Sequence, residues 1–244
     1  MSKAQIDKLG DRIKQSNTSN EDLTLLDEYR RSFTEPYNLV LGKIRKELSQ
    51  KPTGRQAKST ASIIDKLRRE SIRLTQIQDI AGCRIVVPDI AEQDRIVSLL
   101  PDLGGNVSVA DRRNKPSNGY RAVHVIYKID GKPIEIQVRT RLQHLWAEWS
   151  EKLSDLFDPG IKYGKGPEVL IQSLTAISVA LANFEKIELE IITLKNLLSK
   201  GKLKPQSNAV LRKLKKDYQD KKEELILHLR EEVRRVSRLK RNKK

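Results

Sequence analysis

The sequence predicts a core of mixed α and β structure, either α/β or α+β, followed by a long helical hairpin. Alternating apolar residues run through 123–127 and 134–138 on either side of Asp130-Gly131, a pair typical of β-hairpin turns. Apolar residues recur at helical spacing before and after this β-hairpin. From residue 168 onward the helical spacing continues with one break, at 201–205.

Length and charge bound the possible functions. The 244 residues suffice for one sizeable domain with an extension, or for two small domains. Lys and Arg number 48 against 32 Asp and Glu, which gives a net charge of +16. This surplus favours polyanionic partners such as nucleotides, RNA or an acidic protein surface. A basic surface that serves only solubility is the alternative.

The single cysteine and the N-terminal residues indicate the compartment. Cys83 lies within the apolar run 80–87, which excludes a disulfide framework and predicts a buried, inert thiol. The first 15 residues lack the apolar centre of a signal peptide, and no window approaches ~18 apolar residues. We therefore expect a cytoplasmic protein.

The first 50 residues are expected to form helices that pack on the core. Apolar residues at helical spacing predict one helix over 3–15 and a second over about 21–48, separated by the polar cluster 16–20. Pro36 is expected to kink the second helix.

A basic loop at 51–59 precedes the next predicted helix. Arg55 and Lys58 lie beside the start of this helix, with hydroxyls that include Ser62, so backbone donors, helix dipole and charge could together bind an anion. The same pattern is also typical of an ordinary capped helix.

Residues 80–87 predict a buried strand that directly follows Asp79. Arg84 lies among apolar neighbours of this strand, where it must find an anion. A covering helix is expected over about 90–100, and a short strand over 106–110.

The second strand of the β-hairpin carries Glu135, Gln137 and Arg139 at alternate positions, so all three point to one face. Such side chains are costly to bury without partners, and this face is therefore expected to look into a site. Asp79 and Glu135 could together hold a divalent cation shared with phosphates. Two unrelated surface acids are the alternative.

Three further helices are predicted after the β-hairpin, over 142–156, 168–200 and 208–239. The last two have apolar stripes that suit an antiparallel hairpin, docked on the core or pairing with another subunit. From residue 201 to the end, 16 Lys and Arg face 6 Asp and Glu. This basic tail favours polyanion contact, although a solvated helix is equally compatible with it.

Four motifs in this order resemble the synthetase domain of the RelA/SpoT family, which makes the alarmones (p)ppGpp. They are Lys58-Ser59-Thr60-Ala61-Ser62-Ile63 with Lys66, Asp79-Ile80-Ala81-Gly82 with Arg84, Asn118-Gly119-Tyr120-Arg121 with His124, and Glu135-Ile136-Gln137-Val138-Arg139-Thr140. The flanking helices resemble those of the short, single-domain members.

This resemblance implies an α+β fold with a nucleotidyltransferase-like mixed β-sheet flanked by helices. It also implies transfer of the β,γ-pyrophosphate of ATP to a ribose 3′-hydroxyl of GTP or GDP, with Mg²⁺ as cofactor. The synthetase core would span 51–160 and a basic helical extension 161–244. That extension resembles the C-terminal helices of tetrameric small members, which implies a possible homo-oligomer.

The resemblance also implies residue roles. The metal and catalytic residues would be Asp79 and Glu135. ATP would be bound by Arg55, Lys58, Ser62, Lys66 and Arg84. The acceptor would be bound by Lys115, Asn118, Tyr120, His124, Gln137 and Arg139, with Tyr120 stacking on the base.

The chain departs from the family pattern in two places and leaves the acceptor open. Gln56 stands where the family commonly has Arg, and Pro116 where some relatives have a second Lys.

Because about 50 residues are too few for a hydrolase domain, we expect synthesis without hydrolysis. One alternative is toxin-like pyrophosphorylation of the tRNA 3′ end, with RNA held by the basic C-terminal helix. Another is a catalytically silent RNA- or ribosome-binding module.

Overall fold

The computed structural model describes residues 1–15, 18–202, 204 and 206–242, so parts of the predicted breaks at 16–20 and 201–205 and the last two residues lie outside it. The chain forms two compact units. Unit 1 consists of Met1–Ile85, Ile96–Ala110 and His124–Val138. Unit 2 consists of Val86–Arg95, Asp111–Val123 and Arg139–Lys244.

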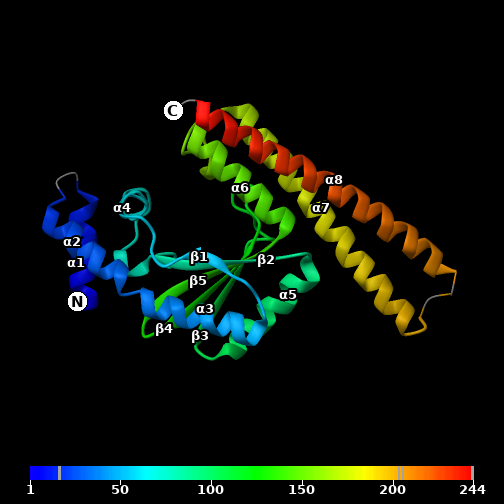
Figure 1. Cartoon of the computed structure of the whole chain (residues 1–244), viewed down its shortest axis with the longest axis horizontal. Coiled ribbons are helices and arrows are strands. Elements are labelled where there is room, and N and C mark those ends of the chain that lie inside the picture. Colours follow the sequence, from blue (N-terminus) through cyan, green and yellow to red (C-terminus); the bar gives the residue numbers. More distant parts are fainter. Residues whose placement is uncertain (16–17, 203, 205, 243–244) are drawn as a thin grey trace. The chain divides into compact units, whose positions relative to one another are not determined.

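Unit 1 begins with the helices α1 (Lys3–Lys14), α2 (Asn20–Arg31) and α3 (Thr34–Leu48) (Figure 1). The prediction of one helix over 21–48 was wrong, because the chain breaks between α2 and α3. Pro36 has no N–H to donate, and its ring would clash with the carbonyl of Ser32 in a continuous helix. In α3 it lies in the first turn, where a missing N–H costs nothing.

A mixed sheet contains the strands β1 (Thr53–Arg55), β2 (Ala81–Val87), β3 (Asn106–Asp111), β4 (Val123–Ile129) and β5 (Lys132–Thr140). Their order across the sheet is β1-β2-β5-β4-β3. The α+β prediction is therefore confirmed. Asp130 and Gly131 both have positive φ, at 50° and 74°, as the predicted β-hairpin turn requires.

Strand β1 lies inside the segment predicted to be a loop. It pairs antiparallel with β2, with Gly54 opposite Cys83. A side chain at Gly54 would approach the Gly82 carbonyl oxygen to 2.3 Å, so only glycine fits this close pairing. Cys83 is buried as predicted, and burial raises the pKa of its thiol to about 12.

Short helices complete the core. They are α4 (Thr60–Arg69), η1 (Leu74–Gln76), α5 (Ile90–Leu99) and η2 (Leu100–Leu103). Within unit 1, α4 contacts both α1 and α2, and α3 contacts η2. The helix predicted over about 90–100 and the strand predicted over 106–110 are both confirmed.

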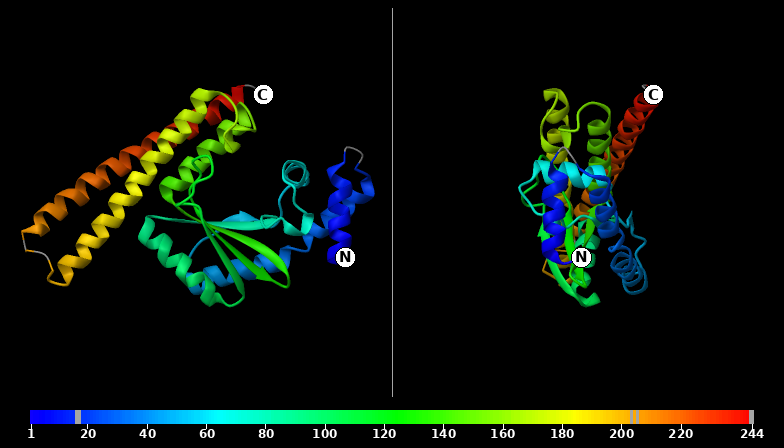
Figure 2. Two further views of the ribbon diagram at one scale, coloured as in Figure 1. Left: turned by 180° about the vertical axis from the view of Figure 1, so that it is seen from behind. Right: turned by 90° about the vertical axis from the view of Figure 1, so that its left-hand side faces the viewer.

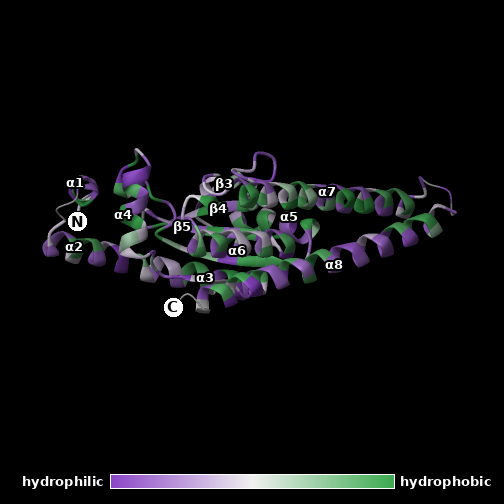
Figure 3. Ribbon diagram, turned by 90° about the horizontal axis from the view of Figure 1, so that it is seen from above, coloured by the Kyte–Doolittle hydropathy of each residue, from purple (hydrophilic) through white to green (hydrophobic). Residues whose placement is uncertain are grey.

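Unit 2 is built on the helices α6 (Arg141–Leu156), α7 (Glu168–Ser199) and α8 (Ser207–Asn242), with η3 (Ile161–Tyr163) between the first two. Figures 1 and 2 show α7 and α8 side by side as the predicted helical hairpin, and both contact α6. Trp146 and Trp149 of α6 join leucines of α7 and α8 in one buried cluster. Hydrophilic residues recur along the length of α8 (Figure 3). No helix among the described residues has the length and apolar content to cross a membrane.

Candidate nucleotide-binding and catalytic site

Asp79 of unit 1 is gripped by two lysines. Its Oδ2 accepts a hydrogen bond from Lys58 Nζ at 2.6 Å, and its Oδ1 accepts one from Lys66 Nζ at 2.9 Å. Burial alone would raise the pKa of Asp79, but the hydrogen bonds and charges of the two ammonium groups lower it to about 2. The side chains of all three residues are about one-fifth exposed or less. The sequence-predicted ATP-binding lysines thus meet at the predicted metal carboxylate.

The backbone of Lys58 is fixed from two sides. Its N–H donates to the carbonyl of Ile80 at 2.6 Å, and its carbonyl accepts from Arg30 Nε at 2.7 Å. Ser59 caps α4 by accepting from the Ser62 N–H. Ser62 therefore lies in the first turn of α4, and the backbone amides of this turn point toward the end of the helix that follows Lys58. Arg55 lies on β1, where it is exposed.

Glu135 of β5 is held by two predicted acceptor-binding residues. His124 Nδ1 lies 2.8 Å from Glu135 Oε1, and Gln137 Nε2 donates to Oε2 at 2.6 Å. Burial raises the pKa of the Glu135 carboxyl, but the hydrogen bonds from His124 and Gln137 outweigh it, so the pKa lies below its ordinary value. An ionised Glu135 requires Nδ1 of His124 to be the donor of this bond.

Strand β2 passes directly beside Glu135. A side chain at Gly82 would come within 2.7 Å of the Glu135 carbonyl oxygen and 3.3 Å of its Cβ. Arg84 follows two residues later on β2, on the same face as Gly82, and is half-buried.

The two carboxylates of unit 1 also interact electrostatically, since the charge of Asp79 acts to raise the pKa of Glu135. Among the residues that the structure describes, no group of three or more His, Cys, Asp or Glu forms a complete metal site. Two carboxylates within electrostatic reach nevertheless fit Mg²⁺, which keeps several waters and takes its other ligands from substrate phosphates.

In unit 2, Tyr120 and Arg139 form a pair. Arg139 Nη2 and Nε donate to the Tyr120 hydroxyl at 2.8 and 3.2 Å, and the guanidinium carbon lies 5.0 Å from the ring centroid. Asn118 and Gly119 both have positive φ, so Tyr120 follows a tight turn closed by its N–H bond to Ser117 O. Lys115 is exposed in the loop before this turn.

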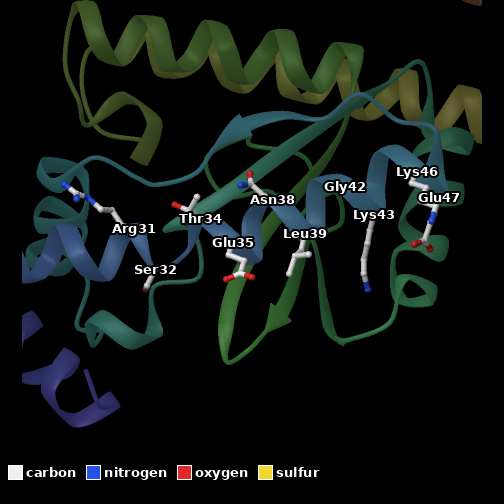
Figure 4. Close-up of a pocket in the computed structure, with 10 residues that line it drawn as sticks. All are labelled: Arg31, Ser32, Thr34, Glu35, Asn38, Leu39, Gly42, Lys43, Lys46 and Glu47. Atoms are coloured by element: carbon white, nitrogen blue, oxygen red, sulfur yellow. The ribbon is translucent and has the colours of Figure 1, made fainter.

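A groove of about 710 Å³ lies on the outer side of α3 (Figure 4). It is lined by residues between Arg31 and Glu47, and no sequence-predicted site residue lines it. The opening in the surface is therefore separate from the polar clusters described above.

Sequence reasoning missed three residues that support these clusters. Arg30 of α2 bonds the Lys58 carbonyl, while Ser178 and Glu185 of α7 bond the loop around Tyr120. Ser178 and Glu185 could have been found in the sequence, because both are polar, lie seven residues apart and fall on the apolar face of the helix predicted over 168–200.

Comparison with known families explains this arrangement of motifs. Residues 55–154 match the family described as the region found in RelA / SpoT proteins. The match covers 100 of the 244 residues, and this part of the chain is similar to the RelA/SpoT region. The resemblance predicted from the four motifs is thereby confirmed, and it covers Asp79, Glu135 and Tyr120.

Curated relatives match parts of their own length. The chain is 42% identical over 119 residues to an uncharacterized protein of Mycobacterium tuberculosis, covering 47% of this chain and 44% of that protein. It is 31% identical over 96 residues to a probable GTP diphosphokinase of Arabidopsis thaliana, covering 38% of this chain and 14% of the relative. The chain therefore spans less than half the length of these relatives.

Solved structures share the fold. Small alarmone synthetase 1 from Bacillus subtilis aligns with a TM-score of 0.51 at 25% identity, covering 71% of this chain and 99% of that one. Its complex with the product pppGpp aligns with a TM-score of 0.50 at 24% identity, covering 66% and 95%. The mixed sheet flanked by helices is thus the fold of a known synthetase.

Proposed function

We propose that this chain is an ATP-dependent pyrophosphokinase that transfers the β,γ-pyrophosphate of ATP to the ribose 3′-hydroxyl of GTP or GDP. The observation that carries the proposal is the pair of ionised carboxylates, Asp79 with two lysines and Glu135 with His124, within a RelA/SpoT region. The relative named a probable GTP diphosphokinase supports a guanine nucleotide as acceptor.

The reaction is a displacement at phosphorus. The acceptor 3′-oxygen forms a bond to the β-phosphorus of ATP, the bond from that phosphorus to the oxygen bridging to the α-phosphate breaks, and AMP leaves. Such a transfer needs positioned cations more than covalent help. Lys58 and Lys66, with Arg55, Arg84 and the first turn of α4 at Ser62, would bind the triphosphate.

Glu135 would take the proton of the 3′-hydroxyl. Its lowered pKa keeps it ionised near neutral pH, and His124 and Gln137 hold its two oxygens in place. Tyr120 would stack on the acceptor base, with Arg139 hydrogen-bonded to its hydroxyl. Lys115 and Asn118 would contact the acceptor from the same loop.

Asp79 and Glu135 would hold Mg²⁺. When bound, this cation would spread the negative charge that develops on the phosphoryl oxygens. Lys58 and Lys66 bond Asp79 in the structure, so we expect both ammonium groups to turn toward the phosphates when ATP and the cation enter together.

A second candidate, pyrophosphorylation of the tRNA 3′ end or another RNA-directed role, is favoured by one observation. Between Ile191 and Lys216 the sequence has eight Lys and Arg and no Asp or Glu. All eight are exposed, and they lie at the end of the hairpin where α7 meets α8. Such an unbalanced patch suits an RNA backbone.

Labelling of the acceptor separates the two candidates. Purified protein is incubated with γ-³²P-ATP and, in separate reactions, GDP, GTP, AMP and bulk tRNA. We expect label on GDP or GTP. Label on tRNA alone would favour the second candidate, while transfer to none of them would reject both enzymatic proposals in favour of a silent binding module.

A further inference from the structure

Helix α7 supplies polar side chains to the loop that carries Tyr120. Ser178 and Glu185 lie seven residues apart on α7 and therefore on one face of the helix. Both lie outside the matched RelA/SpoT region, which ends at residue 154. Neither belongs to the four motifs, so their contacts require an explanation of their own.

Ser178 holds the tight turn before Tyr120. Its Oγ donates to the carbonyl of Gly119 at 2.7 Å. The turn is pressed closely against the helices, because a side chain at Gly119 would come within 2.9 Å of Trp146 and 3.1 Å of Ser178 Cβ. The direction in which Tyr120 leaves the turn is therefore set by α6 and α7 together.

Glu185 connects both chain segments that carry the Tyr120–Arg139 pair. Its Oε2 accepts from Arg121 Nε and Nη2, at 3.0 and 2.5 Å, and Arg121 directly follows Tyr120. Its Oε1 accepts from Gln143 Nε2 at 2.7 Å. Gln143 Oε1 in turn accepts from the N–H of Thr140, the residue after Arg139, at 3.0 Å.

These contacts are shielded from water. The side chains of Arg121 and Glu185 are 11% and 12% exposed, and Gln143 is 1% exposed. Hydrogen bonds to charged groups at low exposure are stronger and more strictly oriented than surface ion pairs. The Glu185 carboxylate of α7 thus holds Arg121 directly and Thr140 through Gln143, and these two residues directly follow Tyr120 and Arg139.

We propose that Ser178 and Glu185 are positioning residues for the acceptor nucleotide, which hold Tyr120 and Arg139 in the geometry that receives its base. The proposal rests on the proposed function, and it makes the C-terminal hairpin a part of the acceptor site. It predicts that loss of either contact weakens acceptor use while ATP use is retained.

Conservative variants test the proposal, since Glu185→Ala would remove the carboxylate that is hydrogen-bonded to the buried Arg121 and could unfold the protein. Ser178→Ala and Glu185→Gln are compared with Ser173→Ala and Glu190→Gln on the same helix. The Ser173 hydroxyl bonds only its own helix at Val169 O in the described contacts, and Glu190 is exposed. We expect KM for the acceptor to rise about tenfold in the first two variants, with KM for ATP within about twofold.

Hydrogen exchange of the substrate-free protein gives an independent readout. Amides of Arg112 and Tyr120 are bonded to Ala122 O and Ser117 O and are expected to be protected. Their exchange should accelerate about tenfold in Ser178→Ala and Glu185→Gln, and stay unchanged in the two control variants.

Unchanged exchange in both test variants would overturn the positioning role, as would faster exchange with an unaltered acceptor KM. Failure of the unsubstituted protein to transfer label to any nucleotide would instead overturn the proposed function, and the exchange result would still stand on its own.

Discussion

At the scale of single residues, Asp79 and Glu135 are kept ionised by different partners. Asp79 faces two full positive charges, whereas Glu135 relies on hydrogen bonds from an imidazole and an amide. On the proposed function, the lysines would turn from Asp79 to the phosphates, while His124 and Gln137 would stay hydrogen-bonded to Glu135. We therefore expect Asp79 to bind the cation and Glu135 to take the proton.

Substitution of either carboxylate tests these roles. Glu135→Gln and Asp79→Asn keep side-chain shape but remove the charge, and each is expected to lower kcat for transfer by about 10²- to 10⁴-fold. Glu47→Gln and Asp65→Asn on exposed helix surfaces are matched controls that should transfer normally. Circular dichroism should show an unchanged fold, and normal turnover in either test variant would reject its assignment.

Asp79 should also make stability depend on pH. Its pKa is lowered from 3.8 to about 2, so the stabilisation is present above pH ~4 and is lost as pH falls through the folded pKa. The lost free energy of unfolding is about 2 kcal/mol. Urea unfolding between pH 6 and pH 2 measures it, and Asp79→Asn should show a correspondingly shallower fall. An identical pH dependence in both proteins would contradict the ion pairs.

Spacing in the sequence predicted which side chains share a strand face, because the pleat has a fixed period. Glu135 and Gln137 were therefore predicted to share a strand face, and in the structure Gln137 Nε2 donates a hydrogen bond to Glu135 Oε2. The support from Arg30 to Lys58 could not be predicted, since it joins residues 28 positions apart whose encounter depends on tertiary packing.

At the scale of elements, the close pairing of β2 with β5 depends on Gly82. Gly82→Ala would place a methyl group 2.7 Å from the Glu135 carbonyl oxygen, so β5 must shift. We expect a loss of about 1–3 kcal/mol in the free energy of unfolding together with reduced transfer.

Gly42 is the matched control, because its added methyl would meet nothing within 4 Å. Gly42→Ala within α3 should stabilise by about 0.5–1 kcal/mol with normal transfer. Equal stability of the two variants would show that β2 tolerates the extra group.

The elements that escaped prediction have physical causes. Strand β1 has three exposed residues without apolar alternation, and it forms because the edge of β2 offers backbone partners. The apolar stripe predicted for α7 was correct at Leu174 and Leu181. The contacts of Ser178 and Glu185 on this stripe could not be predicted, because their hydrogen-bond partners, Gly119 and Arg121, lie in a loop distant in sequence.

At the scale of the whole molecule, the end of the α7–α8 hairpin is strongly basic. Residues 191–216 carry eight Lys and Arg and no acid, so this segment contributes +8 to the net charge of +16. The C-terminal half of α8, residues 225–242, carries six Lys and Arg against two acids, and one of these acids, Glu232, lies 3.6 Å from Arg235. Segment 191–216 thus differs from the rest of the hairpin in having no acidic residue to offset its cations.

Neutralising this end tests the RNA-directed candidate. Replacement of Lys213, Lys215 and Lys216 together by Gln should weaken tRNA binding, because contacts to phosphates are lost. Each lost contact should also reduce the slope of log K against log salt by about 0.7–0.9. Gel shifts at several salt concentrations measure this slope. Replacement of Lys3, Lys8 and Lys51, which are exposed in unit 1, removes the same charge and should leave the slope unchanged. Equal loss of slope in both triple variants would mean that RNA responds to total charge alone, and an unchanged slope in both would place RNA contact elsewhere.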